Sequence, residues 1–434
     1  MKEEFQPVKG TRDFLPEDKI RRQEVVDLLR EVFETFGFEP LETPSLERWE
    51  ILSRKYAGGD EILKETYKLK DQGGRELGLR YDLTVPLCRV IAGRQDLSWP
   101  FKRYQIGRVW RDGPIKFGRY REFWQCDVDV IGPESMVAEA ELIKMIETVA
   151  EKLDFDIEIK INNRKILNGV LKYVGISKEM SLDVILSLDK LEKIGKDGVV
   201  EELKGKGIKN DTIKKLMNIL NVEGSNEEIL KRIEEIRESA EGVKELKEVL
   251  EYSKILGVKK MRVVPTLSRG LAYYTGTVFE AFFKGSKITS SFAAGGRYDE
   301  LIGKFLGSDD IPAVGFSFGL DVICDALEEK TEKQRTVVKF FIIPINTKIK
   351  SLEILKELRE SGIKTDIDLM ERSISKNLNY ANSREIPFCI FVGEKELEKN
   401  SVKLKNMKTG EEILIKVENL VKEIKKRCGS ENRK

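Results

Sequence analysis

The stretch TLSRGLAYYTGTVFE, residues 266–280, contains residue types that suggest chemistry. It places Arg269 beside glycines, a pair of tyrosines and a glutamate in a segment of strand-like composition. Because burying an unpaired guanidinium is costly, we expect an anionic group to meet Arg269. The rings of Tyr273 and Tyr274 offer flat walls with hydroxyl ends, which suit a small planar molecule with polar edges. The alternative is an edge strand with a solvated arginine and two core tyrosines.

A second such segment is RYQIGRVWRDGPIKFGRYREFWQCDVDVIG, which predicts two antiparallel strands between Phe101 and Ile131 with a long loop between them. Four arginines, Arg108, Arg111, Arg119 and Arg121, are too many for a half-buried hairpin unless phosphates or carboxylates meet them. Alternation places Arg121, Phe123, Gln125, Asp127 and Asp129 on one face. That face combines a cation, an aromatic ring, an amide and two carboxylates. The alternative is a surface hairpin with randomly placed charges.

Several chemistries are excluded by what the sequence lacks. It contains no histidine, which removes imidazole bases, Ser-His-Asp and Cys-His systems and HExxH metal sites. Its five cysteines form no CxxC pair, so neither a disulfide framework nor a thiolate zinc site is indicated. The phosphate-binding pattern GxxxxGK[ST] is also absent. A nucleotide is therefore expected to lie on an antiparallel sheet, where arginines, carboxylates and amides do the chemistry and any metal would be a hard ion held by oxygen.

Length and charge describe the rest of the chain. A chain of 434 residues is expected to form two to four domains. No apolar run reaches about 18 residues and MKEEFQPVKG is unlike a signal peptide, which predicts a cytoplasmic protein with no membrane association. The segment from Arg335 to the end contains 22 basic and 15 acidic residues, a formal net charge of about +7. This basic end suggests a polyanionic partner, although a solvated lysine-rich surface is the alternative.

Periodicity predicts the elements that position these residues. A helix is expected from Glu17 to about Phe36, followed by an extended segment, GFEPLETPSLE. The strongly charged interval 165–254 predicts a separate, mainly helical insertion. Glycine-rich strands are expected around 266–283 and 291–298, before a helix that begins near Gly319. From Thr336 onward, alternating strand and helix patterns predict a small α/β domain with a largely parallel sheet.

The hairpin resembles motif 2 of the class II aminoacyl-tRNA synthetases. Four further segments extend the resemblance to the histidyl-tRNA synthetase family: KGTRDFLP, LRYDLTVPL at 79–87, SRGLAYYTGTVFE, and AAGGRYDEL at 293–301. REIPFCIFVGEKEL and KNMKTGEE near the end are similar to the anticodon-binding domain of this enzyme group. RYREFWQCDVD together with RYDLTVP resembles the archaeal and eukaryotic branch more than the bacterial one.

The resemblance implies an α+β fold, in which an antiparallel sheet core flanked by helices carries a helical insertion and a C-terminal α/β anticodon-binding domain. The implied division is 1–164 for the first part of the catalytic core with motifs 1 and 2, and 165–254 for the insertion. Residues 255–330 would complete the core with the histidine-pocket motifs and motif 3, and 331–434 would form the anticodon-binding domain. Pro44 resembles the motif 1 proline at the family's dimer interface, which implies a homodimer; an ordinary strand proline is the alternative.

The implied activity is that of a histidine–tRNA ligase, which activates L-histidine with ATP and Mg²⁺ and then transfers histidyl to tRNA(His). The implied histidine-binding residues are Asp82, Thr84, Arg111, Gln125, Asp129, Arg269, Tyr273, Tyr274 and Tyr298. Those implied for ATP are Arg111, Arg119, Phe123 and Arg269, with Arg111 and Arg269 as catalytic residues. Asp82, Thr84 and Gln125 would bind the α-amino group, and Asp129 with Tyr274 the imidazole. No protein-held metal site is implied.

Two positions depart from the family pattern. Ala272 stands where aspartate is common, and Val322 stands where motif 3 usually has an arginine over the adenine and phosphates. Val322 leaves two alternatives open. One is a catalytically idle paralogue that serves as a regulatory subunit of ATP phosphoribosyltransferase in histidine biosynthesis. The other is a non-catalytic module that senses tRNA. Gly295 and Gly296 suit either a tight turn or a pocket wall.

Overall fold

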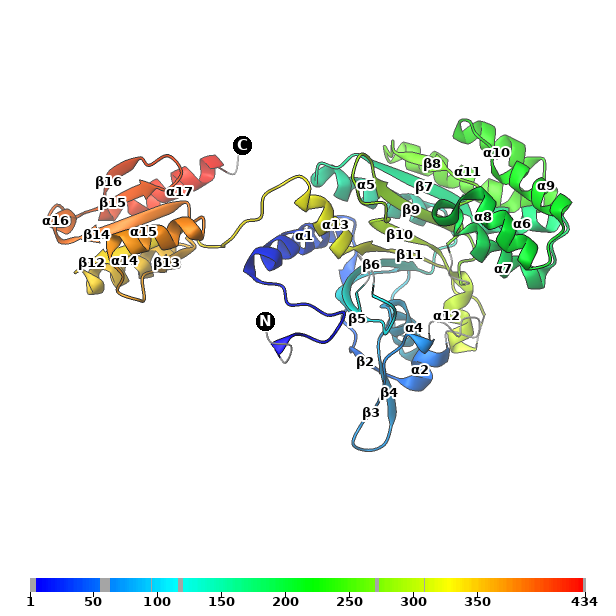
Figure 1. Cartoon of the computed structure of the whole chain (residues 1–434), viewed down its shortest axis with the longest axis horizontal. Coiled ribbons are helices and arrows are strands. Elements are labelled where there is room, and N and C mark those ends of the chain that lie inside the picture. The colour runs from blue at the N-terminus through cyan, green and yellow to red at the C-terminus, as the bar shows by residue number, and fades with distance from the viewer. Residues whose placement is uncertain are drawn as a thin grey trace. The chain divides into compact units, whose positions relative to one another are not determined.

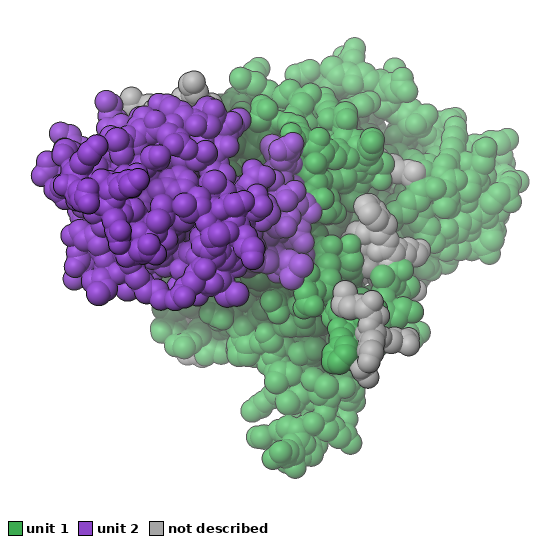
Figure 2. Space-filling view, turned by 60° about the vertical axis from the view of Figure 1, so that its left-hand side comes forward, with its two compact units in different colours: residues 1–13, 25–330 green, residues 14–24, 331–434 purple. Residues whose placement is uncertain are grey.

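The structure is a computed structural model that describes residues 5–54, 63–94, 96–115, 120–269, 273–307 and 309–431. The chain divides into two compact units (Figures 1 and 2). Unit 1 contains Met1–Asp13 and Val25–Lys330, and unit 2 contains Phe14–Glu24 and Thr331–Lys434. The finer division into four parts stays a prediction. Among the described helices, none combines the length and the apolar character that crossing a bilayer requires.

An eight-stranded sheet forms the centre of unit 1, in the order β1-β5-β6-β11-β10-β9-β7-β8 (Figure 1). Its strands are β1 (Glu39–Pro40), β5 (Phe101–Trp110), β6 (Glu122–Ile131), β7 (Ile157–Asn163), β8 (Met261–Val263), β9 (Thr277–Phe283), β10 (Ala293–Arg297) and β11 (Ala313–Gly319). The two outermost pairs, β1–β5 and β7–β8, are parallel, and the pairs between them are antiparallel. The predicted antiparallel core and its hairpin from Phe101 to Ile131 are therefore confirmed.

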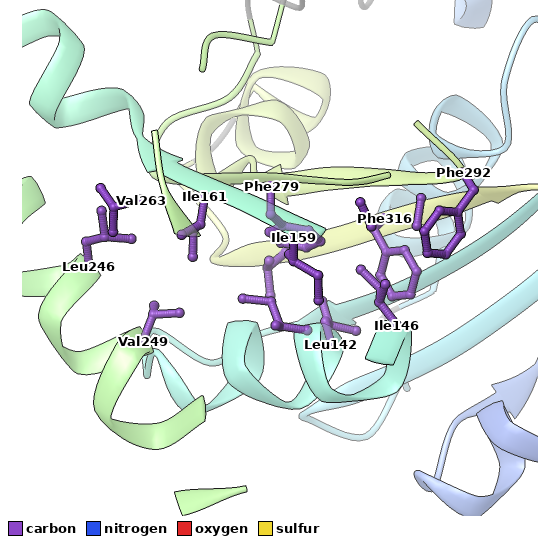
Figure 3. Close-up of a cluster of buried hydrophobic side chains, with 14 of the residues drawn as sticks. Leu142, Ile146, Ile159, Ile161, Leu246, Val249, Val263, Phe279, Phe292 and Phe316 are labelled. Carbon is purple, nitrogen blue, oxygen red and sulfur yellow. The ribbon is translucent and has the colours of Figure 1, made fainter. Parts of the chain in front are cut away.

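Helices bury one face of this sheet. α1 (Pro16–Thr35), α5 (Val137–Lys152), α11 (Ala240–Ile255) and α13 (Leu320–Glu328) contribute side chains to its largest hydrophobic cluster. Figure 3 shows Leu142 and Ile146 of α5 beside the sheet residues Ile159 and Phe316. The spacing of four residues between Leu142 and Ile146 places both side chains on the same face of the helix. Packing therefore holds the strands from one side and leaves their other face for the site.

The helices between 164 and 255 pack into the same hydrophobic cluster as the sheet. They are α6 (Arg164–Tyr173), α7 (Lys178–Leu188), α8 (Leu191–Gly205), α9 (Asn210–Leu220), α10 (Asn226–Glu234), the 3₁₀ helix η2 (Arg237–Ser239) and α11. Leu246 and Val249 of α11 lie near Val263 of β8 (Figure 3). The predicted helical character is confirmed, and these helices belong to unit 1.

A smaller layer lies in the N-terminal half of unit 1 (Figure 1). It contains α2 (Trp49–Arg54), α4 (Thr84–Gly93) and a three-stranded sheet in the order β2-β4-β3, with β2 (Leu46–Arg48), β3 (Lys68–Lys70) and β4 (Glu76–Leu79). α4 packs against α12 (Asp299–Leu306). Buried side chains of α4, α12 and the tyrosines at 274 and 298 form a second hydrophobic cluster. This cluster positions the start of α4 and the end of β10 beside each other.

Two expectations about glycine-rich segments need correction. The strand in 266–283 begins only at Thr277, and the described residues before it form turns and irregular chain. Pro265, which cannot donate to a strand ladder, and the turn bond from Leu267 N to Val264 O, 2.9 Å, explain the difference. Gly295 and Gly296 lie inside β10 rather than in a tight turn. The turn interpretation is therefore wrong for both.

Unit 2 contains a five-stranded sheet in the order β13-β12-β14-β15-β16. Its elements are β12 (Phe340–Ile345), α14 (Lys348–Glu360), β13 (Thr365–Ile367), α15 (Ile374–Ser383), β14 (Phe388–Gly393), α16 (Glu394–Leu397), β15 (Ser401–Asn406), β16 (Glu412–Lys416), η3 (Val417–Asn419) and α17 (Leu420–Glu431). The α/β domain is confirmed, but the sheet is mixed: β12 pairs parallel with β13 and β14, whereas β15 pairs antiparallel with β14 and β16. The short connections after β14 and β15 cannot hold the crossover that parallel pairing needs.

Candidate active site

A cavity of ≈ 940 Å³ lies over the open face of the central sheet. All nine residues predicted to bind histidine line it, and they come from segments as distant as Asp82 and Tyr298. Of the remaining residues predicted to bind ATP, Phe123 lies beside the lining residue Arg111, whereas Arg119 lies outside the described part of the chain. The structure therefore brings together residues that the sequence distributes over more than 200 positions.

The N-terminus of α4 presents Asp82 and Thr84 to the cavity. Asp82 is buried, and its Oδ1 accepts hydrogen bonds from the backbone N–H groups of Thr84, 3.1 Å, and Val85, 2.9 Å. These bonds satisfy donors that a helix start leaves unpaired and favour a negative charge there. The turn thus fixes a carboxylate at the cavity wall, in a position to meet a cationic group.

Strand β6 presents Gln125, Asp127 and Asp129 on its cavity face, as alternation predicted. Among the described residues, Gln125 Oε1 and Asp127 Oδ1 are buried acceptors with no hydrogen-bond partner. Burial raises the pKa of Asp127 to about 7, against the opposing charge of Arg103. Two unpaired acceptors beside each other are an arrangement that an ammonium donor satisfies.

Asp129 is held on several sides. The hydroxyl of Tyr298 donates a hydrogen bond to Oδ1, and the Arg103 guanidinium lies 2.6 Å from Oδ2. Gly315 on β11 is the residue opposite Asp129, and a Cβ there would lie 2.0 Å from Oδ1. Burial and the Asp129 charge raise the pKa of the Tyr298 hydroxyl well above its ordinary value, so it stays a donor. Glycine at 315 is thus what leaves room for this carboxylate.

The anionic partner predicted for Arg269 is Glu280 of β9, with which its guanidinium forms an ion pair. Burial lowers the pKa of Arg269, but Tyr274 and Glu280 outweigh that effect and raise it, which keeps the side chain charged. In the described part of the chain, its Nε is buried without a hydrogen-bond partner. The solvated-arginine alternative is therefore wrong. A fixed cation in the cavity wall, with one donor unused, suits an anionic ligand.

Arg111 lies between two aromatic rings. Its guanidinium carbon is 4.2 Å from the centre of the Tyr81 ring and 4.8 Å from that of Phe123, and its Nε donates to the Tyr81 carbonyl, 3.3 Å. These contacts fix the orientation of the cation, and its remaining donors have no hydrogen-bond partner among the described residues.

Three tyrosines form an apolar wall. The ring centroids of Tyr273 and Tyr274 are 4.7 Å apart, and those of Tyr273 and Tyr298 are 6.1 Å apart. A Cβ at Gly296 would lie 2.4 Å from the backbone oxygen of Thr277 and 3.0 Å from the Tyr274 ring, so glycine at this position permits close packing behind the wall, although Gly296 does not itself line the cavity. Such a wall accommodates a flat ring and excludes water around it.

Several cavity residues were not assigned from the sequence. Tyr81, Glu280, Asp189 and Lys193 line it, with Asp189 in the turn between α7 and α8 and Lys193 in α8. No local pattern marks Asp189 or Lys193, because only the tertiary packing of the α7–α8 segment brings them to the cavity. Arg103 was also missed; it lies directly opposite Asp129 in the observed register of the hairpin.

The charges of the cavity favour a small cationic molecule on one side. Five carboxylates line it, from Asp82, Asp127, Asp129, Asp189 and Glu280, against three cations from Arg111, Lys193 and Arg269. Within the described residues, no group of three or more acidic or cysteine side chains is arranged to hold a metal ion.

Val322, which replaces the usual motif 3 arginine, is half-buried and packs against the large hydrophobic cluster. Its neighbour Asp321 forms an ion pair with Arg12, 2.5 Å, whose guanidinium lies 3.9 Å from the centre of the Tyr120 ring. The KGTRDFLP segment therefore supplies a cation that pairs with Asp321, the residue before Val322, and lies on an aromatic ring.

Comparisons with known proteins identify the family of the chain. The family model described as "Histidyl-tRNA synthetase" matches residues 10–323, and the one described as "Anticodon binding domain" matches residues 339–427. "Histidine--tRNA ligase 1" of Bacillus cereus is 46% identical over 427 residues, covering 96% of this chain and 99% of the relative. The histidyl-tRNA synthetase of Nostoc sp. PCC 7120 is 32% identical, with a TM-score of 0.87 over 98% of this chain and 99% of that one.

A further solved structure, an "ATP phosphoribosyltransferase regulatory subunit/histidyl-tRNA synthetase" from Bacillus halodurans C, shares the fold at 23% identity, with a TM-score of 0.75 over 89% of this chain and 98% of that one. The relatives named here are bacterial, and the archaeal and eukaryotic resemblance stays a prediction. From its family matches and its relatives, the chain belongs to the histidyl-tRNA synthetase family.

Proposed function

We propose that this chain is a histidine–tRNA ligase, which joins L-histidine to ATP and transfers the histidyl group to tRNA(His). The observation that carries the proposal is the convergence of the nine histidine-site residues on one cavity that holds carboxylates, arginines and an aromatic wall. A regulatory paralogue would lack the terminal domain or the Arg269 segment. This chain matches the anticodon-binding family over residues 339–427, and its Arg269 lines the cavity.

The amino-acid side of the cavity would hold histidine through three sets of contacts. Asp82, Thr84 and Gln125 would bind the α-ammonium group, and the unpaired Gln125 Oε1 supports this assignment. Asp129 would accept the ring N–H of the imidazole, with Tyr274 at the other nitrogen. Tyr273 and Tyr298 would close the wall around the ring. A site built from such polar groups rejects isosteres that a purely apolar slot would admit.

The phosphate side would carry out activation. A histidine carboxylate oxygen forms a bond to the α-phosphorus of ATP, the bond to the bridging β-oxygen breaks, and pyrophosphate leaves with its electron pair. Arg111 would bind the substrate carboxylate and α-phosphate, while Arg269 would face the α-phosphate as negative charge develops. Phe123 would stack on adenine and Arg119 would lie near the γ-phosphate. Mg²⁺ would enter bound to the triphosphate, as part of the substrate.

In the second step, a ribose hydroxyl oxygen of the terminal tRNA adenosine forms a bond to the histidyl carbonyl carbon and releases its proton, while the bond from that carbon to the phosphate oxygen breaks and AMP leaves with the electron pair. The basic residues from Arg335 onward would hold the tRNA, because 22 basic and 15 acidic side chains lie between that residue and the end. We assign residues 1–164 and 255–330 to the catalytic core, 165–254 to the insertion and 331–434 to the anticodon-binding domain. The active form would be a cytoplasmic homodimer joined through the segment of Pro44, which is exposed.

Aminoacylation tests this function directly. The protein is incubated with ATP, Mg²⁺ and labelled histidine, together with tRNA(His) or with a tRNA of another identity. We expect labelled histidyl-tRNA only with tRNA(His). Labelled tRNA(His) that forms equally well without ATP, or no labelled tRNA at all from folded protein, would reject the proposal.

A further inference from the structure

The largest fully buried side chain in the described part of unit 1 is a cation, Arg103 of β5. A buried guanidinium is destabilising unless an anion compensates it. Its Nη2 lies 2.6 Å from Asp129 Oδ2, with 1% of the Arg103 side chain and 6% of the Asp129 side chain exposed. None of its three guanidinium nitrogens has a hydrogen-bond partner among the described residues, so charge rather than hydrogen bonding defines the contact.

The hairpin register explains why these two residues meet. Arg103 and Asp129 are directly opposite each other across β5 and β6, where side chains of an antiparallel pair are closest. Asp129 lines the cavity, whereas Arg103 is not among the residues that line it. The guanidinium therefore acts on the carboxylate from behind and does not reach a ligand itself.

The consequence for recognition lies in the two protonation states of a carboxyl group. An ionised carboxylate only accepts hydrogen bonds, whereas a protonated carboxyl also donates. A buried carboxylate without a cation tends to become protonated. With Arg103 behind it and Tyr298 donating to Oδ1, Asp129 is held as an acceptor toward the cavity. It then selects a ring that carries an N–H.

We propose that Arg103 is a positioning residue that determines specificity: it fixes Asp129 as an oriented acceptor for the ring N–H of the amino-acid substrate. This inference rests on the proposed role of Asp129 as the imidazole-binding carboxylate. Arg103, which does not contact the substrate, would thus determine the preference for rings that carry an N–H over rings that do not.

The test compares histidine with 4-thiazolylalanine, whose ring has an acceptor nitrogen but no N–H. Pyrophosphate exchange into ATP is measured for wild type, Arg103→Met and Asp129→Asn. We expect Arg103→Met to raise the KM for histidine by about 10- to 100-fold, the effect of losing a hydrogen bond to a charged group. The KM for ATP should stay within about twofold, and the preference for histidine over thiazolylalanine should fall at least about tenfold.

The matched control is Arg297→Met. Arg297 forms the other deeply buried arginine–carboxylate pair of the described chain, with Glu139 at 2.6 Å and exposed fractions of 3% and 0%, and neither residue lines the cavity. It should lower the unfolding temperature, as Arg103→Met does, but leave the histidine-to-thiazolylalanine preference unchanged. If Arg103→Met changes that preference no more than Arg297→Met does, Arg103 is merely structural and the inference is overturned.

Two further outcomes separate this inference from the proposed function. If Asp129→Asn leaves the KM for histidine unchanged, the placement of the imidazole fails. If Asp129→Asn raises it but Arg103→Met does not, only the role of Arg103 fails. Should Arg103→Met not fold, Arg103→Lys is compared with Arg297→Lys. A selective rise in the KM for histidine supports the inference, and equal effects on histidine and ATP overturn it.

Discussion

Arg103 and Asp129 lie opposite each other on the β5–β6 hairpin, with 2.6 Å between Nη2 and Oδ2. The same hairpin thus supplies the cavity with a carboxylate and, behind it, the cation that compensates the carboxylate. Gly315 on the neighbouring strand leaves the space for this pair. Strand register, rather than a mobile loop, therefore determines the geometry of the proposed imidazole site.

Gly315→Ala tests that geometry. The new Cβ would lie 2.0 Å from Asp129 Oδ1, so the carboxylate has to move. We expect the KM for histidine to rise at least about tenfold and the free energy of unfolding to fall by about 1 to 3 kcal/mol, as is usual for overpacking. Kinetics and denaturant unfolding measure both quantities.

Gly319→Ala on the same strand is the matched control, because its Cβ would meet Val322 Cγ2 only at 3.3 Å. It should leave the KM for histidine within about twofold. Equal kinetic effects from the two alanines would show that Gly315 does not serve Asp129.

Arg269→Ala removes the proposed transition-state cation. We expect adenylation to slow by about 10²- to 10³-fold, the usual effect of losing one preorganised donor. Single-turnover adenylate formation measures this rate. Arg262→Ala, which removes an exposed arginine on β8, is the control and should change the rate little. An unchanged rate in Arg269→Ala would leave this arginine as the partner of Glu280 alone.

Val322→Arg should supply the cation that motif 3 lacks. We expect a lower KM for ATP, by about tenfold for one added charge-assisted contact, and an almost unchanged KM for histidine. If Arg12 already fills this role, Arg12→Ala should raise the KM for ATP and Val322→Arg should be harmful. Steady-state kinetics of both single variants separates these outcomes, and no effect of either on ATP would remove position 322 from the nucleotide site.

Asp127 makes stability depend on pH. Burial raises its pKa from 3.8 to about 7, so between these values the folded state holds a proton that the unfolded chain releases. The folded state is therefore most stable at the acidic end of this range, and the free energy of unfolding falls as the pH rises toward 7. Arg103, Asp129, Asp82 and Ser317 are the groups that act on this carboxyl besides burial.

Asp127→Asn should remove that dependence. From pH 5.0 to 6.5, wild type should lose about 2 kcal/mol of unfolding free energy relative to the variant, given about 1.4 kcal/mol per pH unit. Denaturant unfolding at both pH values measures the difference. The control is Asp211→Asn, a substitution at an exposed position. Its free energy of unfolding should change with pH in parallel with that of wild type. Parallel curves for Asp127→Asn as well would contradict the raised pKa.

Much of the site was predictable because its residues lie in short contiguous motifs. The hairpin alternation placed Gln125, Asp127 and Asp129 on one face, and the structure agrees. Asp189 and Lys193 were not predictable, because they reach the cavity only through the tertiary packing of the α7–α8 segment. Likewise, the antiparallel pairing of β15 with β14 was not predicted. It arises because the connection between the two strands is too short for a crossover, and strand periodicity alone does not indicate the direction of a strand.

The central claim is that the cavity activates histidine. The most direct measurement is pyrophosphate exchange into ATP with each of the twenty standard amino acids in turn, for wild type and for Asp129→Asn. We predict exchange with histidine alone, and a loss of at least about tenfold in kcat/KM for histidine in the variant. Exchange of comparable efficiency with another amino acid, or no histidine-dependent exchange in folded wild-type protein, would contradict the account.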